Sequence, residues 1–461
     1  MDTTTVLDHL NTCYETKQPI DNDLIDTFTT SVNSHTPDLP QLISIINQIL
    51  LGESNIDPMG MLVALLEKLL GNLSFKEILQ VYPAEFILQY LVNYEENPVV
   101  NQLCLKILNL NLHDEQTQEF LRSNGVLIKL LEIYFKRNTP IGVLNQIEKL
   151  TSLLTTTEFA LLVTPSYLQL FSSFRHVDDT TILARYLDYL TLILPKLKSV
   201  DPTLYQFTKR EIDQIEDPLF LILLAQFYGK LLEQPINIEP PLNDFISLYV
   251  DGKLDELVKG ELINVIAKMS YLDKYTSILE HSQLFKTHNL IKVFEHDQSD
   301  INLLSKANPD VIVQLNYSVY RDVLDNLSLF NDNLYLPILL NFIKSPVIFG
   351  LLSSQFNYLK FSGMSMDKLY LILLSMSEKG HTKEYLFNNL PNVITQYLLE
   401  SEISNNQLWK LKLEIFTNLL SDPEVVGYAY WHDELNRVYE LMKYGKSFRN
   451  VTKVDIMDET V

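Results

Sequence analysis

The side chains best suited to chemistry in this sequence are nine histidines, which could bind a metal ion or transfer protons near neutral pH. A helical zinc site needs two histidines one turn apart, in the pattern His-Glu-x-x-His. That pattern is absent, and no histidine stands next to a cysteine. His281, His288 and His296 come closest, but their spacing does not put them on adjacent turns of one helix. We therefore predict no metal site and no cofactor.

A second chemical candidate is the triplet Gly445-Lys446-Ser447, which resembles the end of a phosphate-binding loop. Such a loop follows a strand and needs an earlier glycine at the position of Glu440, and neither requirement is met. Gly-x-Ser-x-Gly and Gly-x-Gly-x-x-Gly patterns are also absent, and the carboxylates are dispersed along predicted helices. The sequence therefore predicts no catalytic residues, and we expect a protein that is not an enzyme.

Binding by an extended surface is the remaining chemistry. In a stack of helical repeats, many similar helices line one groove. We place the second helix of each repeat on that groove, so polar residues spaced for one helical face become the candidates. They are Glu85, Gln89, Asn93, Lys129, Glu132, Lys136, Asn392 and Gln396. The alternative that each is an ordinary exposed helix position stays open.

The elements that position these residues are marked by a recurring helix-start signal, a polar residue followed by proline and an apolar run. The polar side chain can accept hydrogen bonds from free backbone N–H groups, and proline suits the first turn. Copies lie about 42, about 78 and about 77 residues apart, and the longer gaps are two periods of about 39, as in HEAT and armadillo repeats. The copies are Asn97-Pro98, Thr139-Pro140, Asp217-Pro218, Ser345-Pro346 and Asp422-Pro423.

The clearest repeat covers residues 115–154. It has a short helix near 119–122, a turn at Asn124-Gly125, a second helix over 126–137 and a third helix over 141–154. In the second helix, the apolar residues have the spacing of one buried helical face; they are Leu127, Leu130, Leu131 and Tyr134. The preceding repeat has helices over 75–82, 84–94 and 99–111. Further predicted helices cover 167–175, 180–194, 219–232, 311–324, 334–344, 368–378, 386–400, 407–420 and 429–444, with a loop over 234–241 and a less regular connection over 284–308.

These patterns predict an all-α fold, a right-handed α-solenoid of armadillo and HEAT repeats. We expect one array over residues 1–444, curved into an arch with a concave binding face, and a flexible tail over 445–461. Sustained alternation of apolar and polar residues, the strand signal, is absent.

The composition limits the classes of partner that we expect for this protein. The formal net charge is −22, from 36 Lys and Arg against 58 Asp and Glu, which opposes direct nucleic-acid binding. The two cysteines, Cys13 and Cys104, are too few for a disulfide framework, and we expect both to be buried or inert in a reducing compartment. Neither a signal peptide nor a membrane span is predicted. We expect a cytoplasmic protein, with the nucleus as a second location, and no membrane partner.

Three segments resemble the fungal Hsm-three family in the same order along a chain of similar length. They are FKEILQVYPAE (Phe75–Glu85), TKEYLFNNLPNV (Thr382–Val393) and WHDEL (Trp431–Leu435) with Arg437 and Tyr439. The resemblance covers about two thirds of the sequence and is weakest over the first 60 or so residues and over 284–308. These segments carry the fold, so they specify the family better than a mechanism.

The resemblance implies a HEAT/armadillo solenoid that acts as an assembly chaperone of the proteasome regulatory-particle base. It would hold the C-terminal small domain of one ATPase subunit, together with other base subunits, and leave before the mature proteasome works. The family is also described in connection with DNA mismatch repair, which we interpret as an accessory role through protein contacts. An armadillo-type transport adaptor is the alternative, although Trp409 and Trp431 alone cannot form the tryptophan ladder of that class.

Overall fold

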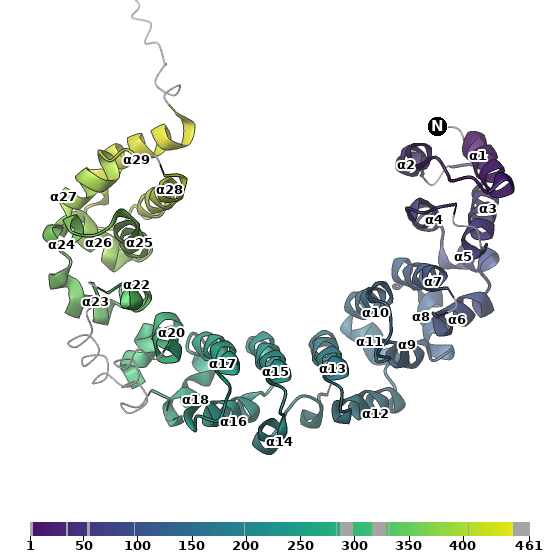
Figure 1. Ribbon diagram of the computed structural model, residues 1–461, viewed down its shortest axis with the longest axis horizontal. Coiled ribbons are helices and arrows are strands. Elements are labelled where there is room, and N and C mark those ends of the chain that lie inside the picture. The colour runs from purple at the N-terminus through teal and green to yellow at the C-terminus, as the bar shows by residue number, and fades with distance from the viewer. Residues whose placement is uncertain are drawn as a thin grey trace, which may run out of the picture. The chain divides into compact units, whose positions relative to one another are not determined.

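The computed structural model describes residues 3–33, 36–52, 56–95, 97–197, 199–282, 284–285, 298–315, 329–330, 332–403 and 405–445. Within these ranges the chain forms helices joined by turns and contains no strand (Figure 1). The predicted all-α class is therefore confirmed. The chain divides into two compact units, Met1–Phe207 with Leu219–Asn237, and Thr208–Pro218 with Ile238–Val461.

The first unit is built of short helices in sequence-adjacent groups. Its helices are α1 (Thr3–Thr16), α2 (Asn22–Ser31), α3 (Leu39–Leu51), α4 (Met61–Leu70), α5 (Phe75–Val81), α6 (Ala84–Val92), α7 (Pro98–Leu110), α8 (Glu115–Ser123), α9 (Val126–Tyr134), α10 (Ile141–Leu153), α11 (Thr156–Leu162), α12 (Pro165–Ser173), η1 (Phe174–His176), α13 (Thr180–Ile193), η2 (Leu194–Lys196), η3 (Pro202–Leu204) and most of α15 (Pro218–Leu231).

Equivalent helices of successive repeats pack side by side in the first unit, which gives three rows. The first helices α5, α8 and α11 form one row, and the second helices α6, α9 and α12 form the second-helix row. The third-helix row contains α4, α7, α10 and α13, and its α7–α10 contact is the most extensive of the three rows. Figure 1 shows the second-helix and third-helix rows on opposite sides of this unit. The predicted three-helix repeat is therefore present.

Polar contacts between repeats report the period directly. Asn109 Nδ2 donates to Gln146, 37 residues further along, and the Thr151 and Tyr189 hydroxyls, 38 residues apart, share a hydrogen bond. In the second unit the Asn418 amide reaches the Ser377 hydroxyl across 41 residues. These separations match the predicted period of about 39 residues.

The second unit continues the same kind of stack. Its described helices are α14 (Lys209–Gln214), α16 (Glu239–Val250), α17 (Glu256–Met269), η4 (Asp273–Tyr275), α18 (Thr276–His281), α20 (Gln298–Lys306), η6 (Asn333–Tyr335), α22 (Leu336–Phe342), α23 (Pro346–Leu352), η7 (Ser353–Gln355), α24 (Tyr358–Ser362), α25 (Met366–Ser377), α26 (Gly380–Asn389), α27 (Pro391–Val393), the π-helix η8 (Ile394–Leu399), α28 (Asn406–Leu420) and α29 (Tyr428–Tyr444). A continuous row runs through α17, α20, α22, α25 and α28.

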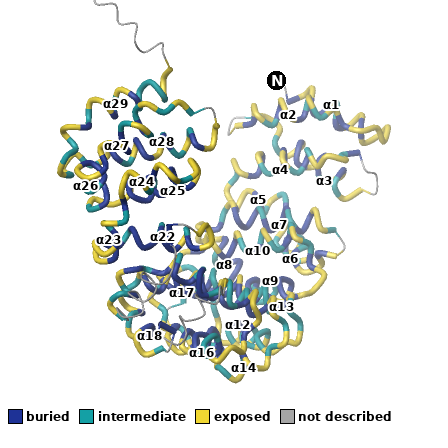
Figure 2. The backbone as a smooth tube through the Cα atoms, turned by 60° about the vertical axis from the view of Figure 1, so that its left-hand side comes forward, coloured by how far each residue is buried: buried dark blue, intermediate teal, exposed yellow. Residues whose placement is uncertain are grey.

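The core of each unit follows the periodicity seen in the sequence. In α9 the four predicted core residues, Leu127, Leu130, Leu131 and Tyr134, are all buried. Figure 2 shows buried and exposed positions alternating along the helices of both units. Burial of one apolar stripe per helix, at roughly 1.5–3 kcal/mol for each large side chain, drives the stacking.

Two of the helix-start signals act as predicted, with a side-chain cap and proline in the first turn. Asn97 Oδ1 accepts from Val100 N at 3.1 Å where α7 begins, and Ser345 Oγ accepts from Ile348 N at 3.3 Å where α23 begins. α15 likewise begins at Pro218.

The other two signals differ from the prediction. α10 begins after Pro140, but the Thr139 hydroxyl is buried and donates to Ile133 O instead of capping the helix. Asp422-Pro423 begins a turn, and the helix starts only at Tyr428, after Gly427 adopts φ 93°. Pro140 thus still marks a helix start, whereas Pro423 does not, and neither preceding polar side chain caps a helix.

Several predicted boundaries were wrong. The helix predicted over 386–400 is broken at Leu390-Pro391, because a proline cannot continue the backbone hydrogen bonds of α26, and the chain resumes as α27 and η8. The predicted loop over 234–241 ends earlier, since α16 takes Pro240 and Pro241 into its first turn. The irregular connection over 284–308 contains α20. Residues 316–324 of the helix predicted over 311–324, and 446–461 of the predicted tail, lie outside the described residues.

Candidate functional site

Six of the eight predicted binding residues lie together on the second-helix row of the first unit. Glu85 and Gln89 are exposed on α6, and Asn93 is exposed where α6 ends. On the neighbouring helix α9, Glu132 is exposed and Lys129 is half-buried. Lys136 follows α9 in the turn after its last residue. The structure thus brings these residues onto adjacent helices, and their role in binding stays a prediction.

One contact joins the two predicted groups. The Lys136 ammonium lies 5.3 Å from the centre of the Tyr94 ring, a cation–π distance, and Tyr94 follows Asn93 at the end of α6. This contact orients Lys136 along the surface while the ammonium stays exposed. A surface of two ammonium groups, two carboxylates and two amides can pair with polar and charged groups of either sign on another protein.

The remaining two predicted residues, Asn392 and Gln396, belong to the second unit. Both are exposed, Asn392 in α27 and Gln396 in the π-helix η8. The Tyr358 hydroxyl donates to Gln396 Oε1 at 2.6 Å, which ties η8 to α24. The two residues thus lie on either side of the junction between α27 and η8, after a helix break that the sequence pattern did not predict.

Sequence reasoning missed polar residues on the third-helix row. Lys106 on α7 forms an ion pair with Glu67 on α4, and Asn109 is buried between α7 and α10. A signal was present, because Lys106 and Asn109 both interrupt the otherwise apolar stretch from Leu103 to Leu110. A polar residue in such a place must find a partner or remain costly.

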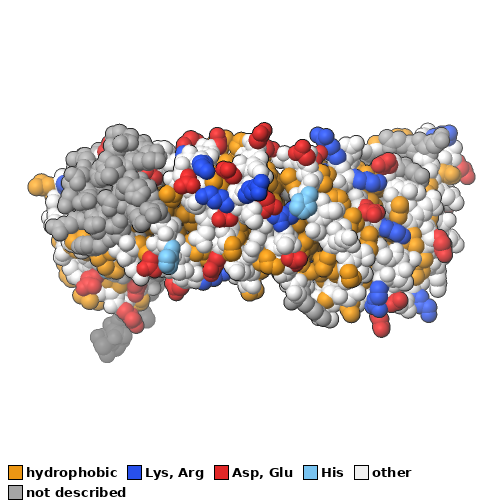
Figure 3. Space-filling model, turned by 90° about the horizontal axis from the view of Figure 1, so that it is seen from below, with side chains coloured by type: hydrophobic (Ala, Val, Ile, Leu, Met, Phe, Trp, Pro, Cys, Tyr) orange, Lys and Arg blue, Asp and Glu red, His pale blue; other side chains and the backbone are white. Residues whose placement is uncertain are grey.

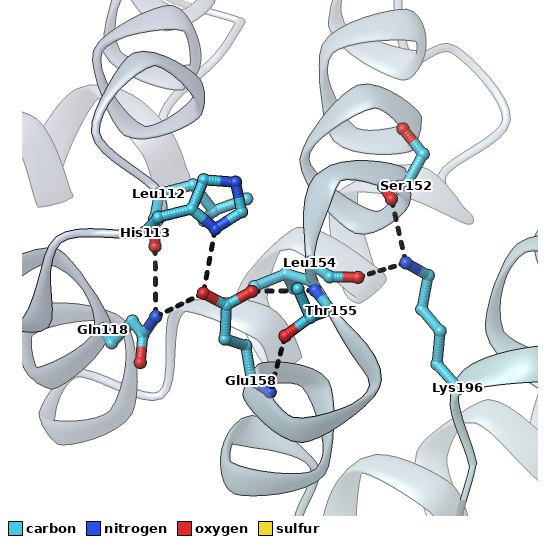
Figure 4. A network of polar contacts seen from close by, with 8 residues as sticks. All are labelled: Leu112, His113, Gln118, Ser152, Leu154, Thr155, Glu158 and Lys196. Carbon is cyan, nitrogen blue, oxygen red and sulfur yellow. Dashed lines mark hydrogen bonds and ion pairs between the residues drawn. The ribbon is translucent and has the colours of Figure 1, made fainter.

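A polar network ties the row of first helices together at its edge (Figure 4). Glu158 accepts from Gln118 Nε2 at 2.8 Å and from Thr155 N at 2.8 Å, and its Oε1 lies 2.9 Å from His113 Nδ1. Burial alone would raise the pKa of Glu158, but the hydrogen bonds with His113 and Thr155 and the His113 charge lower it to about 2. Lys196 meanwhile donates to the carbonyls of Ser152 and Leu154. These hydrogen bonds cap helix ends, and the polar groups of the network are paired with one another.

The strongest shift of a cationic pKa belongs to Lys412 on α28. Its side chain is buried, and burial lowers the pKa of its ammonium to about 8. Nζ donates to Ser401 O at 2.7 Å and lies 3.1 Å from Ser401 Oγ, and the Tyr370 hydroxyl lies 3.0 Å from the same oxygen. Because the ammonium donates to a backbone carbonyl just after the end of η8, we interpret Lys412 as a structural cap of that helix.

In the described part of the chain, no three His, Cys, Asp or Glu side chains are grouped closely enough to hold an ion. His281 bonds the Ser277 carbonyl at 2.6 Å, whereas His288 and His296 lie outside the described residues. Cys13 and Cys104 are free and buried as predicted, and burial raises the pKa of Cys104 to about 12.

The surface drawn in Figure 3 mixes Lys and Arg with Asp and Glu, and the coloured residues there form no large patch of one sign. Such interspersed charge suits solubility and protein contacts better than a phosphate backbone. None of the helices in the described ranges is both long and apolar enough to cross a membrane.

Comparisons with known proteins find two family models that together cover nearly all of the chain. The model described as DNA mismatch repair protein HSM3, N terminal domain, matches residues 4–233, and the corresponding C terminal domain matches residues 235–461. The protein named DNA mismatch repair protein HSM3 of Candida albicans is 48% identical over 99% of this chain and 98% of its own length. Its namesake in Scheffersomyces stipitis is 37% identical over 100% and 97%.

Proposed function

The chain belongs to the family of DNA mismatch repair protein HSM3, and from this membership and its repeat architecture we propose that it is a non-catalytic assembly chaperone. Its client is the base of the proteasome regulatory particle, and it binds the C-terminal small domain of one ATPase subunit. The client's identity rests on the family resemblance, and the mode of binding rests on the stacked helices.

The observation that carries the binding mode is the second-helix row of α6, α9 and α12. Its apolar side chains are buried against neighbouring helices, while Glu85, Gln89, Glu132 and Lys136 stay exposed on a scaffold held by its own core. A preorganised surface of this kind loses little conformational entropy on binding. It can cover a surface that an unassembled subunit would otherwise expose to wrong partners.

Release is the second requirement of a chaperone. A contact surface of mixed polar groups gives moderate affinity, because most exposed ion pairs contribute less than about 1 kcal/mol each. The finished ring, with its larger subunit interfaces, can then displace the chaperone. We accordingly propose that the protein leaves before the mature proteasome forms, and that it works in the cytoplasm, with the nucleus as a second location.

Co-precipitation tests the proposal. The tagged protein, purified from a fungal extract, should recover free proteasome ATPase subunits and base intermediates but not mature proteasomes. Recovery of no ATPase subunit would reject the client. Binding to isolated C-terminal small domains, each expressed separately, then identifies which subunit is held.

A second candidate is an accessory role in mismatch repair, which the printed names of the relatives favour. We propose that any such role acts through protein contacts, because the net charge of −22 opposes duplex binding. A fluorescence-anisotropy titration with mismatched duplex DNA should show no salt-sensitive binding. Measurable affinity that falls with salt would contradict the indirect role.

A further inference from the structure

A cavity of about 410 Å³ lies in the second unit, at the N-terminal end of α25. Its lining comes from α24, from the turn that leads into α25, from the first turn of α25 and from the segment before α22. Helices α22 and α25 are neighbours in the continuous row of this unit (Figure 1). The volume is many times the roughly 30 Å³ of one water molecule, so the cavity can hold a group of several atoms. We call it the Lys368 cavity.

The charged side chains that line the Lys368 cavity are both cationic. They are Lys360 and Lys368, and no carboxylate is among the lining residues that the structure describes. Lys360 Nζ lies 4.8 Å from the centre of the Phe330 ring, and Phe330 is itself part of the lining. Lys368 is only 7% exposed, and its Nζ lies 3.5 Å from Oδ1 of Asn333, which is another lining residue. Both ammonium groups therefore lie against walls of the cavity.

The Lys368 ammonium has few partners for a buried cation. Its contact with Asn333 is at the outer limit of hydrogen-bond length and can use one of its three N–H donors. Within the described part of the chain this ammonium forms no ion pair. Burial lowers the pKa of Lys368, with a smaller opposing effect from Asp332, whose Oδ1 accepts from Leu334 N at 2.8 Å. An anion bound beside Lys368 would offset the cost of burying its charge.

The start of α25 adds hydrogen-bond donors at the same place. The first backbone N–H groups of a helix have no partner inside it, and Ser365, at the N-cap, makes no side-chain capping hydrogen bond. Ser365 lines the cavity, so its hydroxyl can donate to a ligand, whereas the exposed Asp367 of the same turn is not part of the lining. The positive end of the helix dipole also lies here. Ammonium groups, a hydroxyl and the N-terminus of a helix together are typical of a phosphate site.

We propose that the Lys368 cavity binds a phosphate group. The Lys360 and Lys368 ammonium groups neutralise its charge, and Ser365 with the first N–H groups of α25 binds its oxygens, which are strong acceptors. The group belongs either to a free phosphate ion or to a phosphorylated side chain of a partner protein. For a side chain, Leu359 offers an apolar contact, because it lines the cavity and is 80% exposed. The proposal rests on the second unit alone and does not depend on the client proposed above.

Thermal unfolding of the full chain in inorganic phosphate tests the site. The unfolding midpoint should rise relative to sodium chloride of equal ionic strength, because a ligand that binds only the folded chain stabilises it. Phosphate also stabilises proteins by being excluded from their surface, so the native chain is compared with the double variant Lys360→Met and Lys368→Met. The double variant should lose at least about half of the rise. Equal rises in the two proteins would overturn the site.

The matched control is Lys379→Met with Lys410→Met, which makes the same change in net charge at exposed positions of the second unit outside the cavity. It should keep the full rise, since distant exposed charges are screened. Circular dichroism checks that both double variants are folded. If loss of the buried Lys368 unfolds the chain, Lys360→Met with Ser365→Ala replaces that variant, and the same reduced rise is expected. An equal reduction in the control would overturn the cavity as the site.

A fluorescein-labelled phosphoserine peptide distinguishes the two sources of phosphate. Fluorescence anisotropy with the full chain compares it with matched peptides that carry serine or glutamate at the same place, and inorganic phosphate serves as the competitor. Tighter binding of the phosphoserine peptide than of inorganic phosphate supports a phosphorylated partner. Binding of inorganic phosphate without binding of the peptide supports the free ion. Equal binding of the glutamate and phosphoserine peptides would overturn the assignment to phosphate.

Discussion

Asn109 and Gln146 join two consecutive repeats through one side-chain amide, whose nitrogen lies 3.2 Å from the Gln146 carbonyl oxygen and 3.0 Å from its Oε1. The hydrogen bond to the carbonyl oxygen holds the Asn109 side chain against the α10 backbone, and the hydrogen bond to Oε1 fixes the Gln146 rotamer. The pair therefore sets the register of α7 against α10.

Replacing Asn109 should consequently destabilise the first unit. Asn109→Ala removes two hydrogen bonds and leaves a small gap, which we expect to lower the free energy of unfolding by about 1–2 kcal/mol. Urea denaturation followed by circular dichroism measures the change. Asn145→Ala, at an exposed position of α10, is the control and should stay within about 0.5 kcal/mol of the native chain. Equal effects of both changes would contradict the inter-repeat role.

Gly427 should tolerate no side chain. Its φ of 93° is unfavourable for other residues, and an added Cβ would lie 2.9 Å from both Phe387 Cβ and Asn388 Oδ1. Gly427→Ala should therefore cost about 2–4 kcal/mol in unfolding free energy, the sum of backbone strain and a steric clash. Gly125→Ala controls for strain alone, because φ is 59° but nothing lies within 4 Å, and should cost about 1 kcal/mol. A similar cost at both positions would show that the clash relaxes freely.

Lys412 should make stability rise with pH on the alkaline side. Burial lowers the pKa of its ammonium from 10.5 to about 8, so between these values the unfolded chain binds more protons than the folded one. The unfolding free energy of the native chain, minus that of Lys412→Met, should therefore increase by about 2 kcal/mol from pH about 8 to pH about 10. Taking the difference removes the titration of the tyrosines common to both. Parallel pH curves would contradict the assignment.

Glu158 should contribute to stability on the acid side. Burial opposes its ionisation, but the hydrogen bonds with His113 and Thr155 and the His113 charge prevail, and the pKa of Glu158 is lowered to about 2. Its contribution is present above pH about 4.5 and is lost as pH falls from about 4.5 towards about 2.

The matching variant is Glu158→Gln, which we expect to lose about 1 kcal/mol near neutral pH, a value discounted for solvent screening at the edge of the unit. The loss should shrink as pH falls towards about 3, when the native carboxylate also becomes neutral. Chemical denaturation across this range measures it, with exposed Glu115→Gln as the control. A pH-independent loss would indicate a purely steric effect.

Charge reversal on the second-helix row tests the proposed client surface. Lys129→Glu with Lys136→Glu should weaken association with the ATPase small domain at least about fivefold. The midpoint of thermal unfolding should fall only slightly, because Lys136 is exposed and Lys129 is only half-buried. Isothermal titration calorimetry measures the affinity. Lys17→Glu with Lys76→Glu, at exposed positions of the first unit, controls for the change in net charge. Undiminished affinity would remove Lys129 and Lys136 from the surface.

Much of the fold could be predicted from the sequence because its cause is local and periodic. The core positions Leu127, Leu130, Leu131 and Tyr134 of α9 follow from a 3.6-residue period, and the start of α7 follows from Asn97-Pro98. The repeat length followed from the spacing of these starts. Each of these signals lies within a few residues of the element that it predicts.

What could not be predicted depends on contacts between distant residues. The Thr139 hydroxyl donates to Ile133 O, which no cap pattern indicates, and η8 follows Pro391 as a π-helix rather than as one long helix. The helices of residues 3–70 went unpredicted, although Asp21 caps α2 and Pro40 lies in the first turn of α3. The ion pair of Lys106 with Glu67 also went unpredicted, since it joins two helices that are far apart in the sequence.

The tether of Asn109 to Gln146 has a consequence for how such chains change over evolutionary time. Such hydrogen bonds join only adjacent repeats. Duplication or deletion of one whole repeat of about 39 residues would therefore leave the contacts between all other repeats intact. Length can thus evolve in whole modules, whereas gaining or losing a single residue inside a third helix would misalign the joints on both sides of it.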